Sequence, residues 1–171
     1  QQYIPKKYIF KYYEPEILDN VFARQRKILD DDSLSKADKE KKAPFFILLD
    51  DVISDPNVLK KDQRHLVKLF TEGRHHKVFV LITTQYAKAI TPMLRGNTDY
   101  IFIMKTIQEP QRECLWNDFG SFMTKPAFFQ MIDTHTEDNE TLVVDTSPEN
   151  KVDPVAMMFW WKACDPGPVS Y

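Results

Sequence analysis

Two apolar runs decide the fold of this chain: FFILLDD at residues 45–51 and VFVLITTQ at residues 78–85. Unbroken apolar runs bounded by polar residues are typical of strands buried on both faces, as in parallel sheets. The segment between them, residues 57–71, carries apolar residues at helical spacing, with Asp55 as a start signal and Gly73 as a stop. The pattern therefore predicts a strand, a crossover helix and a second, parallel strand.

The same alternation extends to both sides of this unit. We expect strands at residues 8–12, 100–104, 142–145 and 157–163, and helices beginning at Glu14-Pro15 and covering about 87–94, 111–119 and 125–132. Strands that alternate with helices indicate an α/β layered fold with a mostly parallel sheet. A chain of 171 residues can form one such core or part of a larger domain.

A charged segment interrupts the pattern at about residues 30–42, DDDSLSKADKEKK. It has almost no apolar side chains, which favours a solvated loop or a frayed extension of the preceding helix. A loop that contacts DNA is the alternative interpretation.

Composition limits the function classes. The 23 basic and 25 acidic residues nearly cancel, so any DNA contact must come from a local patch or from oligomerisation. Cys114 and Cys164 lack metal-ligand spacing and favour a reducing compartment. We find no signal peptide and no membrane-spanning apolar run, and we expect no membrane insertion. The first residue is Gln1, which we interpret as the start of a fragment or of an upstream-trimmed product.

The polar residues after the two central strands are the candidates for chemistry. In parallel α/β sheets, ligands bind at the carboxyl ends of the strands. Asp50 and Asp51 follow the first run as in a Walker B strand, where one acid serves Mg²⁺ and the next can polarise attacking water. A strand end that is merely capped by two acids is the alternative. Gln85 follows the second run.

Four motifs in order carry a resemblance to a known family: LLDD, LFTEGRH, LITTQ and LRGNTDYIFI, with IPKKYIFKYY and RQRKIL upstream. Together they resemble the FtsK–HerA superfamily of DNA pumps, and within it the poxvirus-type genome-packaging ATPases of large DNA viruses. The similarity extends over roughly residues 4–165.

The resemblance implies a P-loop NTPase fold, a RecA/FtsK-like three-layer sandwich, with ATP and Mg²⁺ as cofactors. Asp50 matches the position of the metal-binding acid and Asp51 that of the catalytic acid, so both would contact the Mg²⁺-nucleotide. Gln85 matches the polar sensor. Arg74 and Arg95 are candidates for an arginine finger supplied to a neighbouring subunit, with a surface ion pair or helix-end contact as the alternative for each.

The phosphate-binding loop of such an ATPase, G-x-x-x-x-G-K-[ST], is absent from this sequence, because none of its four glycines precedes a lysine. The family places this loop upstream. We therefore expect residues 1–171 to be the C-terminal portion of a single packaging-ATPase domain, without the Walker A strand and helix. The isolated chain is expected to be inactive, with part of its sheet uncovered.

The expected function is ATP-driven translocation of double-stranded viral DNA into the capsid. It implies a homo-oligomeric ring at a capsid portal or membrane vertex, in the host cytoplasm or viral factory, or associated with the virion. Two alternatives stay open: a catalytically inactive assembly module that keeps the fold, and a metal-dependent nuclease that adds a further acid, such as Asp99 or Asp145, to Asp50 and Asp51.

Overall fold

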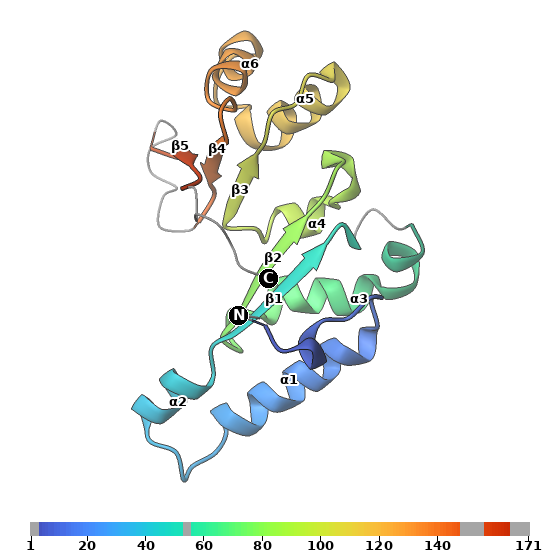
Figure 1. The fold of residues 1–171 in the computed structure, drawn as a ribbon, viewed down its shortest axis with the longest axis vertical. Helices are drawn as coiled ribbons and strands as arrows, with labels where there is room; N and C mark the ends of the chain where they lie inside the picture. Colours follow the sequence, from blue (N-terminus) through green and yellow to red (C-terminus); the bar gives the residue numbers. More distant parts are fainter. Residues whose placement is uncertain (1–3, 53–55, 148–155, 165–171) are drawn as a thin grey trace. The chain divides into compact units, whose positions relative to one another are not determined.

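The computed structural model describes residues 4–52, 56–147 and 156–164, with the backbone alone over residues 56–63. The chain divides into two compact units, the first covering residues 3–94 and the second taking in residues 95–171 (Figure 1). Each unit has a sheet and a hydrophobic core of its own.

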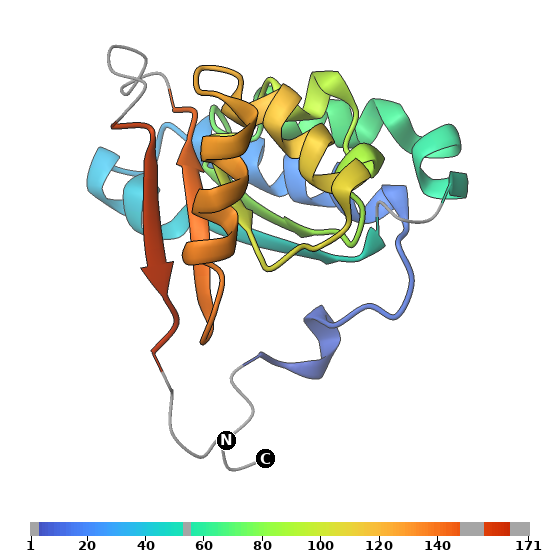
Figure 2. The ribbon, with the colours of Figure 1, turned by 90° about the horizontal axis from the view of Figure 1, so that it is seen from above.

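A two-stranded parallel sheet forms the centre of the first unit. Strand β1 (Phe45–Asp50) pairs with β2 (Val78–Thr83) in a register that runs from Phe45 opposite Val78 to Asp50 opposite Thr83. Helix α3 (Pro56–Glu72) connects the strands, and α1 (Pro15–Leu29) precedes them. Both helices lie on the same side of the sheet (Figure 2). The predicted strand, helix and parallel strand are confirmed.

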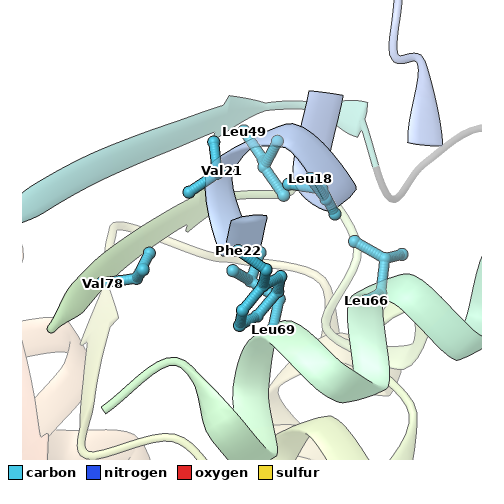
Figure 3. Close-up of a cluster of buried hydrophobic side chains, with 7 residues drawn as sticks. All are labelled: Leu18, Val21, Phe22, Leu49, Leu66, Leu69 and Val78. Carbon is cyan, nitrogen blue, oxygen red and sulfur yellow. The ribbon is translucent and has the colours of Figure 1, made fainter. Parts of the chain in front are cut away.

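The core of this unit fills the space between the helices and one face of the sheet. Its buried side chains come from all four elements: Leu18, Val21, Phe22, Leu49, Leu66, Leu69 and Val78 (Figure 3). Leu66 is fully buried, and Phe70 packs against the cluster. Over residues 64–71, where the side chains are described, the predicted helical face is thus the face that contacts the sheet.

The opposite face of the same sheet is apolar and exposed. Phe46, Leu48, Phe79 and Leu81 expose between 40% and 63% of their surface, and the rings of Phe46 and Phe79 stack 5.5 Å apart. The prediction that both strands are buried on both faces is therefore wrong for the described residues. The physical reason is that α1 and α3 cover only one side, so alternate side chains of each strand face outward.

The flanking segments of the first unit differ from the predictions. Residues 8–12 do not form a strand; a 3₁₀ turn, Lys6–Tyr8, begins after Pro5, and the Tyr8 N–H donates to the Pro5 carbonyl at 2.9 Å. In the charged segment, a turn is followed by helix α2 (Lys36–Lys42). The predicted helix at 87–94 is two short pieces, Ala87–Ala89 and α4 (Pro92–Arg95), because Pro92 cannot continue a helix.

The second unit is an antiparallel sheet covered by helices. Strand β4 (Glu140–Asp145) lies between β3 (Tyr100–Ile103) and β5 (Met158–Lys162). Helix α5 (Glu109–Leu115), a π-helical turn (Trp116–Gly120) and α6 (Lys125–Thr134) supply the packing partners of the sheet. Figure 2 shows α6 alongside the strands.

Close packing in the second unit depends on Gly120. A Cβ atom there would lie 2.4 Å from the ring of Phe128, which is fully buried. The absence of a side chain at Gly120 therefore lets α6 approach the π-helical turn.

The expectation of a mostly parallel sheet is wrong for these three strands. Only β4 is mostly buried, over its last five residues, whereas most of β5 and half of β3 are exposed. Burial on both faces, however, does not fix strand direction, so the run could not distinguish parallel from antiparallel pairing. The fold is mixed α/β, with one small parallel and one antiparallel sheet. None of the described helices is long and apolar enough to cross a bilayer.

Gln25 holds α1 against the segments that lead into the parallel strands. Its side chain is fully buried, and Nε2 donates to the carbonyls of Ala43 at 2.5 Å and His76 at 2.6 Å. Ala43 precedes β1 and His76 precedes β2. One amide therefore satisfies two carbonyl groups at the amino end of the sheet.

We predict that Gln25→Met lowers the free energy of unfolding by about 1–3 kcal/mol, because two carbonyls lose their donor. Urea unfolding followed by circular dichroism measures the change. Gln130→Met, the same substitution at an exposed position of α6, is the matched control and should stay within about 0.5 kcal/mol of the parent. Equal effects of the two substitutions would contradict the anchoring role of Gln25.

Helix α2 begins at a capping pair. The Asp38 N–H donates to Ser35 Oγ at 3.1 Å, and the Ser35 hydroxyl donates to Asp38 Oδ2 at 2.7 Å. The hydrogen bond from Ser35 holds the pKa of the Asp38 carboxyl below its usual value, and Lys42 adds to the effect. A depressed folded-state pKa stabilises α2 above the ordinary carboxyl pKa, and this contribution is lost as the pH falls through the folded value.

We predict that Ser35→Ala returns the pKa of Asp38 toward its ordinary value and increases fraying of α2. An NMR titration of the Asp38 carboxyl carbon measures the first effect, and amide exchange in residues 38–42 the second. Asp31, whose pKa is lowered by Ser33 instead, is the internal control and should titrate unchanged. An Asp38 titration identical in both proteins would contradict the assignment.

Candidate functional site

The carboxyl ends of β1 and β2 bring the polar residues predicted from the sequence together. Asp50, the last residue of β1, lies opposite Thr83, the last residue of β2. The Thr83 hydroxyl donates to Asp50 Oδ1 at 2.5 Å. Because the strands are parallel and adjacent, their polar ends share one edge of the sheet.

Asp51 turns the chain away from β1 and contacts both Thr83 and Gln85. Its φ angle is 53°, in the left-handed region, where Asp and Asn are among the more tolerated residues. Its backbone N–H donates to Thr83 Oγ1 at 3.0 Å, and Gln85 Nε2 donates to Asp51 Oδ2 at 2.9 Å. The predicted proximity of Asp50, Asp51 and Gln85 is confirmed.

This group of four side chains, Asp50, Asp51, Thr83 and Gln85, is exposed to solvent. It offers carboxylate, hydroxyl and amide oxygens, which are the hard donors that Mg²⁺ prefers. Mg²⁺ is usually held by one or two carboxylates together with water and substrate phosphates, so the donor set fits this ion. Within the described part of the chain, no three His, Cys, Asp or Glu residues gather as a self-sufficient metal cage.

The two candidate arginines belong to different units, Arg74 to the first and Arg95 to the second. Arg74 belongs to the turn between α3 and β2, at the amino end of the strands, whereas the carboxylates are at the carboxyl end. Six strand residues separate the two ends by on the order of 15 Å. Arg95, the last residue of α4, pairs with Asp118 at 3.2 Å, and only 17% of its side chain is exposed. The geometry of the first unit does not bring Arg74 to Asp50 and Asp51.

The further acids considered for a nuclease belong to the second unit. Asp145 is buried at the end of β4, and its Oδ1 accepts the Ser147 N–H at 2.9 Å. Asp99 precedes β3, and its carbonyl accepts the Thr146 N–H at 2.8 Å. The Asp145 carboxylate thus binds the backbone just after its own strand, which is a structural role.

Thr83 is the member of the group that the motif analysis missed. Its hydroxyl donates to one aspartate and accepts from the backbone of the other. Its position in the strand could have indicated its role. If the two strands are aligned in parallel, Thr83, two residues before Gln85, lies opposite Asp50. A motif centred on Gln85 gave no reason to examine this residue.

Comparison with known proteins gives viral relatives. The chain is 32% identical over 162 residues to an uncharacterized protein of Acanthamoeba polyphaga mimivirus, a match that covers 92% of this chain and 56% of that protein. It is 26% identical over 163 residues to an uncharacterized protein of Frog virus 3 (isolate Goorha), covering 94% and 47%. A third relative, an uncharacterized protein of Invertebrate iridescent virus 3, is 30% identical over 147 residues, covering 84% and 52%.

The chain spans about half the length of these curated relatives. No family model matches the sequence.

We predict that the Arg95–Asp118 pair contributes to stability. In a double-mutant cycle with Arg95→Met and Asp118→Asn, the coupling free energy should be about 1–3 kcal/mol, because both side chains are mostly buried and water screens their attraction only weakly. Thermal and urea unfolding measure it.

The Lys105–Glu137 pair is the matched control, since 57% of each of its side chains is exposed. Its coupling should be below about 1 kcal/mol. A coupling at Arg95–Asp118 no larger than this control would show that Arg95 is not held by a structural ion pair.

Proposed function

We propose that this chain is the Walker B and sensor portion of an ATPase that moves double-stranded viral DNA into the capsid. In this proposal Asp50 binds Mg²⁺, Asp51 polarises the attacking water, and Gln85 orients that water or contacts the γ-phosphate. The proposed fold of the complete protein is a P-loop NTPase of the FtsK–HerA type.

The main support for the proposal is the contact between polar side chains at the carboxyl ends of two adjacent strands. Asp51 and Gln85 are 34 residues apart in sequence, and their side chains meet at 2.9 Å. Phosphoryl transfer from a Mg²⁺-nucleotide uses an acid that holds the metal and a residue that orients the nucleophile, and two acids beside a polar side chain can supply both. The exposure of the group supports access by a nucleotide, which a pair of acids that only capped their own strands would not need.

In this proposal the phosphate-binding loop is supplied by residues other than these 171. The curated relatives are about twice as long as the region that matches, so such a loop has room in a longer polypeptide. The exposed apolar face of β1 and β2 supports the same proposal, because parallel sheets are normally covered on both faces. We propose that the full-length protein adds a Walker A strand, loop and helix to this sheet.

The proposed partners follow from the motor function. The near-neutral charge of the chain does not by itself attract DNA, so a homo-oligomeric ring would gather the DNA contacts at its centre. Arg74 lies at the end of the sheet away from the carboxylates, and it can serve as a finger only toward a neighbouring subunit. The proposed location is a capsid portal or membrane vertex in the host cytoplasm, viral factory or virion.

We predict that Asp51→Asn in the full-length protein preserves ATP binding and lowers turnover by about two orders of magnitude or more, because the charge that polarises water is lost. Asparagine tolerates the left-handed backbone at this position and can still accept from Gln85. Asp50→Ala should instead weaken Mg²⁺-ATP binding, because a metal ligand is lost. Equilibrium nucleotide binding and steady-state hydrolysis, with and without double-stranded DNA, separate the two effects.

Asp30→Asn, a change of the same kind at an exposed position after α1, is the control and should leave both quantities unchanged. Parental turnover in Asp51→Asn would remove Asp51 from the mechanism. A full-length parent that binds no nucleotide would favour the inactive assembly module, and DNA cleavage dependent on Asp50 and Asp51 would favour the nuclease.

A further inference from the structure

Thr83 forms hydrogen bonds with both aspartates of the proposed site. Its hydroxyl has one proton to donate and two lone pairs that accept. The proton goes to Asp50 Oδ1 at 2.5 Å, and one lone pair accepts the Asp51 N–H at 3.0 Å. A single side chain from β2 thus joins the last residue of β1 to the residue that follows it.

Each of these contacts fixes a different degree of freedom. The bond to Oδ1 restrains rotation of the Asp50 carboxylate, so that its second oxygen, Oδ2, which makes no hydrogen bond with the described residues, has a defined direction. The bond from the Asp51 N–H holds that residue in its left-handed conformation, with φ at 53°. This conformation determines where the Asp51 side chain leaves the backbone, and Gln85 then fixes its Oδ2.

We propose that Thr83 is a positioning residue of this site, which orients the Asp50 and Asp51 carboxylates for a divalent cation and its bound water. The inference rests on the proposed function, and it assigns a role that neither the Walker B acids nor the sensor glutamine supplies. Without the Thr83 hydroxyl, both carboxylates keep their charge and place in the sequence but lose their fixed directions. Metal sites are sensitive to this, because the partners of a ligand set its orientation.

The test uses Mn²⁺ alone as the probe, added to the isotopically labelled 171-residue chain, with paramagnetic broadening of amide signals as the readout. In the parent, the signals of Asp50 and Asp51 should broaden at lower Mn²⁺ concentration than those of Asp30 to Asp32. Those three consecutive acids, which lie outside the helices and strands, report non-specific binding within the same sample.

Thr83→Val removes the hydroxyl but keeps a β-branched side chain suited to a strand, and Thr83→Ser keeps the hydroxyl. We expect Mn²⁺ affinity at Asp50 and Asp51 to fall about fivefold to tenfold in Thr83→Val, the loss that one charge-assisted hydrogen bond brings. Thr83→Ser should restore the parental affinity. Hydrogen exchange of the Asp51 amide should be faster in the valine variant and parental in the serine variant.

The outcomes are distinct. Parental Mn²⁺ affinity in a folded Thr83→Val protein, or failure of Thr83→Ser to restore it, overturns the positioning role and leaves the proposed function standing. Broadening at Asp50 and Asp51 that merely matches Asp30 to Asp32 in the parent overturns the proposed metal site itself, and the inference with it. Circular dichroism melting of both variants shows whether β1 and β2 stay paired; a valine variant that unfolds, while serine retains fold and affinity, assigns Thr83 a structural role and also overturns the inference.

Discussion

The parallel pairing of β1 with β2 is the constraint on which the candidate site depends. Adjacent parallel strands have their carboxyl ends at the same edge of a sheet. Residues more than thirty positions apart in sequence therefore become neighbours through the strand pairing alone. The register sets which residues meet: Asp50 faces Thr83, and a shift by one position would turn Thr83 to the other face of the sheet. The packing of α1 and α3 on the inner face, together with the Gln25 anchor at the amino end, holds that register.

The sequence predicts the positions of the strands and helices better than it predicts the direction of strand pairing. Continuous apolar runs located all five described strands to within about two residues at each end, and helical spacing found α1, α3 and α6. Strand direction was not predictable in the same way, because β4 is buried over its last five residues, as a parallel strand would be, and yet pairs antiparallel on both sides. At residues 8–12, aromatic composition suggested a strand, but the turn after Pro5 decided the local conformation.

Some residues of the candidate site were predictable from the sequence, and others were not. Asp50, Asp51 and Gln85 were predictable because each lies within three residues after the end of an apolar run, and strand ends converge in parallel sheets. Thr83 was not singled out because its importance comes from the register, which only the paired structure provides. The partners of Arg74 and Arg95 were not predictable for a different reason. An arginine in a sequence motif does not show which carboxylate it will pair with, and Arg95 pairs with Asp118 of its own unit.

Exposure to solvent keeps the repulsion between two adjacent carboxylates small. Two charges about 4 Å apart repel by roughly 1 kcal/mol in water, but by several times more where solvent is excluded. At an open sheet edge the repulsion between Asp50 and Asp51 is therefore small, and hydrogen bonds from Thr83 and Gln85 help to hold them. Any ligand that covers this edge removes water and raises the repulsion, so it must bring positive charge of its own. A nucleotide that arrives with its divalent cation meets this requirement, whereas a neutral or purely anionic ligand does not.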